Sequence, residues 1–201
     1  MSDAQPQVEF YFDTICPWCW MTSRWASEVA EVRGFEITWK PISLKIINEK
    51  NVDHVHGEAH RKAHGYARVV EAARVAAGDA AVGKLYTELG TRIHPGARTD
   101  MDEIIAESLA AAGLDAALAD AVNDETTDVQ LRETTNHALE IAGPDVGVPI
   151  ISIDGKAFFG PVVTPAPSGA DALKLWDALH AASQIPGFYE LKRGRTVGPQ
   201  L

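Results

Sequence analysis

The two cysteines of this chain stand two residues apart in the segment ICPWCW, residues 15–20, directly after the apolar run VEFYF. That run predicts a buried strand at residues 8–13, and the helical pattern behind it predicts a helix from Cys16 to about Val32. Both cysteines then lie at the amino end of a helix. The pair constrains the fold more than any other feature, because it marks a strand-to-helix turn that also carries chemistry.

A structural disulfide is the first of three interpretations of this pair. A bond between Cys16 and Cys19 would close a very short loop, and so would remove little entropy from the unfolded chain. A chain of 201 residues also buries enough apolar surface to fold without a covalent bridge. We therefore set the structural disulfide aside.

A metal site is the second interpretation, and it requires further ligands. The candidates form one cluster, His54, His56, His60 and His64. His60 and His64 stand four residues apart, a spacing that zinc can use on a helix. No carboxylate or cysteine accompanies them at ligand spacing, and the segment HGEAHRKAH fits a solvated, charge-rich helix start. The sequence therefore predicts no metal.

A redox pair is the third interpretation and the one we favour. The first turn of a helix offers unpaired N–H groups and the positive end of the helix dipole, which stabilise a thiolate. Pro17 suits that turn, because its missing N–H would be unpaired there in any case. The position predicts that Cys16 is the reactive thiolate that meets solvent, and that Cys19 is tucked into the first turn.

The segments after the first helix divide into outer α/β parts and a central helical block. Trp25, Val29 and Val32 share one side of the first helix, and FEITWKPI at residues 35–42 predicts a second strand. From residue 45 to residue 135, Ala-rich segments with helical periodicity predict an inserted helical subdomain, in which LDAALADAVND is one helix.

Strand character returns near the carboxyl end of the chain, in GVPIISIDGKAFFGPVV. The pair Asp154-Gly155 between two apolar runs predicts a hairpin. The following segment SGADALKLWDALHAAS predicts a last helix that Ser168 caps. Trp20, Trp25 and Trp176 are expected in the core.

Composition limits the partners and the compartment. The formal net charge of −10 opposes a phosphate backbone, so nucleic acid is not an expected partner. No stretch is apolar enough for a membrane span, and the amino-terminal MSDAQPQVEFYF lacks the basic region of a signal peptide. Two cysteines in a C-x-x-C suit a reducing compartment. We expect a soluble, cytoplasmic protein.

A proline at the head of the returning strand, in DVGVPII, adds a second active-site signature. Proline is the residue for which a cis peptide bond is cheap. A C-x-x-C with such a proline resembles the thioredoxin fold, in which a cis-proline lies across from the cysteines. The helical block resembles the insertion of the DsbA family. The resemblance implies an α/β thioredoxin-fold domain from residues 1–44 and 136–201, with an all-helical insertion at residues 45–135.

Five stretches narrow this resemblance: CPWCWMTSRW, LYTELGTRIH, DVGVPII, FFGPV and ELKRGRT. They are similar to the cytoplasmic mycothiol-dependent nitroreductases. The resemblance implies that Cys16 attacks, Cys19 resolves and Pro149 is the cis-proline. Val148 stands where the related proteins carry threonine. The segment NEKNVDHVHGEAH matches poorly, so no substrate-binding residue is carried over from it.

The expected function is that of a thiol-disulfide oxidoreductase, in which Cys16 forms a mixed disulfide that Cys19 resolves. By resemblance, mycothiol or a similar small thiol supplies the electrons, no cofactor is tightly bound, and nitroaromatic compounds are possible further substrates. Val148 and Pro149 would shape the edge on which disulfide substrates dock. Trp18 either stacks on a flat substrate or packs against the inserted helices.

Two alternative functions stay open. A kappa-type glutathione transferase or isomerase shares this architecture, but that resemblance implies a serine where this chain has Cys16. A non-catalytic binding protein on a thioredoxin scaffold would need no reactive thiol. The sequence does not decide the physiological substrate, the direction of electron flow or the oligomeric state.

Overall fold

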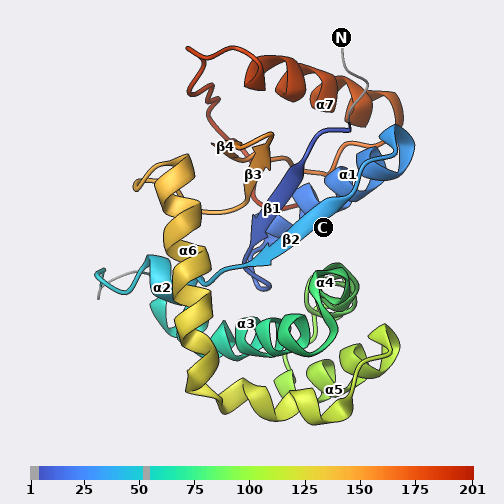
Figure 1. The fold of residues 1–201 in the computed structure, drawn as a ribbon, viewed down its shortest axis with the longest axis vertical. Coiled ribbons are helices and arrows are strands. Elements are labelled where there is room, and N and C mark those ends of the chain that lie inside the picture. Colours follow the sequence, from blue (N-terminus) through green and yellow to red (C-terminus); the bar gives the residue numbers. More distant parts are fainter. Residues whose placement is uncertain (1–4, 52–54) are drawn as a thin grey trace.

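The computed structural model describes residues 5–51 and 55–201, and one four-stranded sheet lies at its centre (Figure 1). The strands lie in the order β2-β1-β3-β4. Strand β1 (Val8–Phe12) pairs in parallel with β2 (Ile37–Pro41) and antiparallel with β3 (Ile150–Ile153). Strand β4 (Lys156–Phe159) completes the sheet antiparallel to β3. The first and last parts of the chain therefore meet in one sheet.

Helix α1 (Pro17–Arg33) leaves the carboxyl end of β1 and ends at Gly34, which has a φ of 74° and donates its N–H to the Ala30 carbonyl. Trp25 and Val29 are fully buried, as predicted. Val32 is 61% exposed, so its predicted place on the buried side is wrong. The buried stripe runs instead through Ala26 and Ala30, and Val32 falls outside it.

The expected helical block is present between β2 and β3. Below the sheet in Figure 1, α3, α4 and α5 pack together, while α7 lies above it. The elements are α2 (Leu44–Ile47), α3 (Gly57–Ala77), α4 (Asp79–Ile93), α5 (Met101–Ala112), the 3-10 helices η1 (Ala116–Asn123) and η2 (Glu125–Thr127), and α6 (Asp128–Ala142).

Two details of this block differ from a simple helical insertion. The segment LDAALADAVND forms the 3-10 helix η1, not an α-helix, and begins where the Asp115 carboxylate accepts the Ala117 N–H at 2.9 Å. Helix α6 continues without interruption across residues 135 and 136. Within the described part of the chain, no helix is both long and apolar enough to cross a bilayer.

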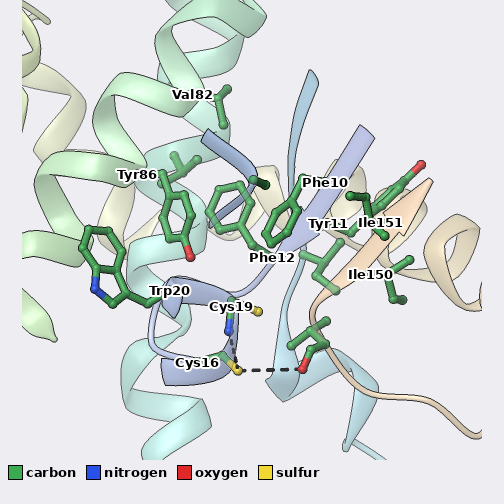
Figure 2. Packing of buried hydrophobic residues seen from close by; sticks show 14 of the residues in the cluster. Phe10, Tyr11, Phe12, Cys16, Cys19, Trp20, Val82, Tyr86, Ile150 and Ile151 are labelled. Carbon is green, nitrogen blue, oxygen red and sulfur yellow. Dashed lines mark hydrogen bonds between the residues drawn. The ribbon is translucent and has the colours of Figure 1, made fainter. Parts of the chain in front are cut away.

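Aromatic rings join the sheet to the insertion. The Tyr86 ring on α4 stacks on the Phe12 ring at the end of β1, with centroids 3.8 Å apart. Trp39 on β2 adds contacts to Tyr86 at 5.8 Å and to Phe10 at 5.2 Å. Figure 2 shows the buried rings of Phe10, Phe12 and Tyr86 beside the first turn of α1. The sheet and the insertion therefore share one hydrophobic core.

The β3–β4 hairpin forms as the Asp154-Gly155 pair predicts. Asp154 and Gly155 have φ angles of 51° and 78°, the positive values that a tight hairpin turn of this kind requires. The Asp154 carboxylate also accepts the Gln7 N–H at 3.0 Å, which ties the turn to the start of β1.

Helix α7 (Gly169–Ser183) follows the hairpin, and Ser168 stands at its N-cap position. The Ser168 side chain makes no capping hydrogen bond, contrary to the prediction. The Glu28 carboxylate on α1 accepts the Gly169 N–H at 2.6 Å instead. Trp176 packs on Phe35 with centroids 4.5 Å apart, and Trp20, Trp25 and Trp176 are all buried, as expected.

Gly90 on α4 lets this helix approach the active-site turn. A Cβ at Gly90 would overlap ring carbons of Trp20, whose other sides are held by His94 at 5.6 Å and Arg24 at 4.2 Å. We expect Gly90→Ala to lower the free energy of unfolding by about 1–3 kcal/mol, because the ring has no room to move. Urea denaturation measures this change.

The matched control is Thr91→Ala on the exposed face of the same helix, which should change stability by less than about 0.5 kcal/mol. At position 90, alanine is a better helix former than glycine by about 1 kcal/mol. Stabilisation by Gly90→Ala would show that propensity outweighs the overlap and would contradict this packing.

Candidate active site

The two cysteines occupy the start of α1 as predicted. Cys16 is the N-cap residue, and its backbone N–H bonds to the Asp13 carbonyl at 3.1 Å. The Cys16 sulfur accepts the Cys19 backbone N–H at 3.5 Å, so it takes the place of the usual N-cap oxygen. The Cys16 sulfur therefore lies at the amino end of the helix, where the backbone N–H groups and the positive end of the dipole point.

Burial separates the roles of the two thiols. Cys16 is 7% exposed, which is less than expected, and Cys19 is 0% exposed. Both are free thiols. Burial raises the pKa of the Cys19 thiol well above its ordinary value, and the adjacent Cys16 raises it further. Of the two cysteines, Cys16 is therefore the less completely buried.

The Val148-Pro149 segment lies opposite Cys16. The Val148-Pro149 peptide bond is cis, as the sequence predicts. The Val148 carbonyl oxygen lies 3.9 Å from the Cys16 sulfur, a contact marked in Figure 2. Gly160 donates its N–H to the Pro149 carbonyl at 2.8 Å, which fixes the segment to the hairpin. Four predicted site residues thus lie together.

Trp18, between the cysteines, is half-buried and has a partner that the sequence did not suggest. The Arg195 guanidinium lies over its ring, 4.5 Å from the centroid. Gln200 donates its N–H to the Thr164 hydroxyl at 2.8 Å, which holds the irregular carboxyl-terminal segment in place. Arg195 belongs to the stretch ELKRGRT, from which the sequence indicated only a family resemblance. Its basic residues in an acidic chain were the available signal.

Asp13 is a second residue that sequence reasoning missed, and it directly follows β1, before the cysteines. Its carboxylate accepts the Ile15 N–H at 3.1 Å and the Leu44 N–H at 2.7 Å. Burial raises the pKa of Asp13 to about 6, although both backbone hydrogen bonds lower it. Asp13 therefore joins the cysteine turn to α2. An acidic residue directly after an apolar strand was the signal.

His94 joins the end of α4 to the same turn. Its Nε2–H donates to the Thr14 carbonyl at 3.0 Å, and its ring stacks on Trp20. Burial lowers the pKa of His94, so the ring is neutral at neutral pH. The histidine comes from the stretch LYTELGTRIH, but its sequence separation from the cysteines hid this contact.

The histidine cluster differs from its expected solvated state. His54 lies outside the described residues, whereas His60 and His64 are buried in α3. The His64 Nδ1 lies 2.8 Å from the Ser43 hydroxyl, and its Nε2 lies 2.9 Å from the Asp128 carboxylate. Across residues 5–51 and 55–201, no group of three or more suitable side chains could hold a metal ion.

The series Ser43, His64, Asp128 has the order of a hydrolase triad but not its accessibility. Ser43 is 0% exposed, so no substrate reaches its hydroxyl. Arg68 binds both carboxylate oxygens of Asp128 at 2.7 and 2.8 Å and, as the main cause, lowers the Asp128 pKa to about 2. The series connects the β2–α2 loop to α3 and α6, which is a structural role.

The sequence matches one known protein family over most of its length. The family model for the Rv2466c-like proteins, described as mycothiol-dependent nitroreductase Rv2466c, matches residues 15–193. The chain belongs to this family. It is also 30% identical over 196 residues to the uncharacterized protein Rv2286c of Mycobacterium tuberculosis, with 94% of this chain and 82% of that protein covered.

Solved structures confirm the DsbA-like thioredoxin fold. A probable DsbA oxidoreductase from Streptomyces coelicolor aligns with a TM-score of 0.59 at 16% identity, covering 96% of this chain and 95% of its own. DsbA from Chlamydia trachomatis aligns at 0.57 and 14% identity, covering 91% and 90%. A 2-hydroxychromene-2-carboxylate isomerase aligns at 0.60 and 17% identity, covering 87% and 94%. The fold alone therefore does not select one chemistry.

The raised pKa of Asp13 predicts a pH dependence of stability. The folded carboxyl keeps its proton up to about pH 6, while the unfolded one releases it near 3.8, so the folded state binds more protons between these values. Stability should therefore fall as pH rises from 4 to 7, by on the order of 2–3 kcal/mol relative to Asp13→Asn. Urea denaturation at each pH measures this change. If the free energies of unfolding of the wild-type chain and of Asp13→Asn change with pH in the same way, the assignment is contradicted.

Proposed function

We propose that the protein is a thiol-disulfide oxidoreductase with Cys16 as the nucleophile and Cys19 as the resolving thiol. The observation that carries this proposal is the Cys16 sulfur at the N-cap of α1, bonded to the Cys19 N–H and opposite the Val148 carbonyl. Family membership supports it, because the family description names a thiol-dependent reductase. Pro149 and Val148 form the docking edge.

The catalytic cycle uses the two sulfurs in turn. The Cys16 thiolate attacks one sulfur of a substrate disulfide and releases the other as a thiolate. Cys19, as its thiolate, then attacks the Cys16 sulfur of the mixed disulfide, so that the reduced substrate leaves and the protein holds the Cys16–Cys19 disulfide. Two molecules of a small thiol reduce that disulfide and leave as their own disulfide.

Mycothiol is the small thiol that the family description supports, and a cytoplasmic location would supply it. Trp18 beside Cys16 offers a flat, half-buried ring to a bound thiol or to a nitroaromatic compound. Reduction of a nitroaromatic would take two electrons from the Cys16/Cys19 dithiol for each disulfide formed. No tightly bound cofactor is required for either reaction.

The isomerase or transferase alternative rests on the shared fold. A cysteine at position 16 with a second thiol in the same helical turn favours exchange chemistry over it. A binding protein without catalysis would have no use for this arrangement of sulfurs.

Single cysteine variants test the assignment of nucleophile and resolver. Cys19→Ser should attack oxidised mycothiol and keep the mixed disulfide, because no second thiol displaces it. Cys16→Ser should form no adduct, because Cys19 is fully buried and its thiol stays protonated. Intact-mass measurement after incubation with oxidised mycothiol detects the adduct.

Oxidised glutathione in a parallel incubation shows whether the reaction selects among small thiols. Equal labelling of both variants, or labelling of Cys16→Ser alone, would reverse or remove the assigned roles. An adduct with glutathione only would contradict the choice of mycothiol and leave the exchange chemistry in place.

A further inference from the structure

The Tyr86 hydroxyl is a buried polar group without a hydrogen-bond partner. Its ring is fully buried on α4, held by the stack on Phe12 at 3.8 Å and by the edge of Trp20 at 6.1 Å. A buried hydroxyl with no partner costs free energy that phenylalanine at the same position would avoid. The hydroxyl therefore calls for an explanation other than packing.

The hydroxyl points toward the cysteine turn. In Figure 2 it extends from α4 toward the first turn of α1, which carries Cys19. A negative charge on Cys19 raises the pKa of Tyr86 more than a negative charge on Cys16 does. Ser23 lowers the pKa of Tyr86 as a nearby hydrogen-bonding group. The single Ser23 hydroxyl proton is nevertheless donated to the Trp20 carbonyl at 2.6 Å, and the Ser23 oxygen accepts the Arg24 Nε–H at 3.2 Å, so Ser23 has no proton left to donate to Tyr86.

The Tyr86 hydroxyl keeps its proton at neutral pH. Burial raises the pKa of Tyr86 well above its ordinary value, and a negative Cys19 raises it further. Tyr86 is thus a hydrogen-bond donor and not a source of protons for exchange. Such a donor becomes useful when a negative charge forms next to it.

A negative charge forms on Cys19 in the proposed reaction cycle. When a small thiolate attacks the Cys16 sulfur of the disulfide, the new S–S bond joins that thiol to Cys16. The electron pair of the broken bond passes to the Cys19 sulfur. Since Cys19 is fully buried, solvent water does not stabilise the thiolate that results.

We propose that the Tyr86 hydroxyl donates a hydrogen bond to the Cys19 thiolate when the Cys16–Cys19 disulfide opens. This inference rests on the proposed function and adds a thiolate-stabilising residue to it. The same hydrogen bond stabilises the Cys19 thiolate that attacks a mixed disulfide in the opposite direction. The helical insertion therefore supplies part of the reaction centre through α4, in addition to covering the sheet.

Tyr86→Phe tests the proposal, because it removes only the hydroxyl and keeps the ring stack on Phe12. We expect dithiothreitol to open the disulfide of this variant about tenfold more slowly than that of the wild-type chain, the effect of one hydrogen bond to a charged group. Stopped-flow tryptophan fluorescence measures this rate. The melting temperature of the reduced protein should stay equal or rise, since an unpaired buried hydroxyl is lost.

Tyr66→Phe is the matched control. Tyr66 is also a buried tyrosine with a raised pKa, but burial and the charges of Asp100 and Asp102 cause that shift, and the cysteines do not contribute to it. In Tyr66→Phe, the rate at which dithiothreitol opens the Cys16–Cys19 disulfide should stay within about twofold of the wild-type rate. An unchanged rate in Tyr86→Phe overturns the proposal, and so does a slower rate accompanied by a lower melting temperature.

A second measurement separates this inference from the proposed function. Exchange of the wild-type disulfide with dithiothreitol is followed by alkylation and intact-mass measurement. If the wild-type disulfide does not exchange with thiols, the proposed function fails, whereas equal opening rates in the wild-type chain and Tyr86→Phe overturn the Tyr86 assignment.

Discussion

The stack of Phe12 on Tyr86, with centroids 3.8 Å apart, is the contact on which the rest of the structure depends. Phe12 ends the central strand, and Tyr86 belongs to the insertion. The stack therefore fixes the insertion against the point where the chain turns into α1. Gly90 and His94 extend this contact to Trp20 from the same helix. Fully buried Cys19 belongs to the same hydrophobic core.

This difference in burial divides the chemistry between two identical side chains. The N-cap position gives the Cys16 sulfur a backbone donor at the positive end of the helix dipole. The interior position of Cys19 raises the pKa of its thiol. In the proposed cycle, Cys19 therefore reacts only with the Cys16 sulfur of the mixed disulfide. This difference in burial gives the proposed cycle an ordered two-step exchange.

Local sequence was sufficient for the features whose causes are local. The strand-to-helix turn at Cys16, the hairpin at Asp154-Gly155 and the cis bond before Pro149 follow from residue types that favour those conformations. Contacts between distant segments were not predictable, because nothing near Cys16 in the sequence points to Tyr86 or Arg195. Buried His64 was misjudged for the same reason, since its partners Ser43 and Asp128 come from other elements.

The equilibrium between the dithiol and the disulfide tests the central claim most directly. The wild-type chain would be equilibrated with reduced and oxidised dithiothreitol at a series of ratios, alkylated, and weighed as an intact protein. The account predicts one two-electron transition between a form with two alkylated cysteines and a form with none. Two alkylated cysteines at every ratio, including the most oxidising, would contradict a redox role for Cys16 and Cys19.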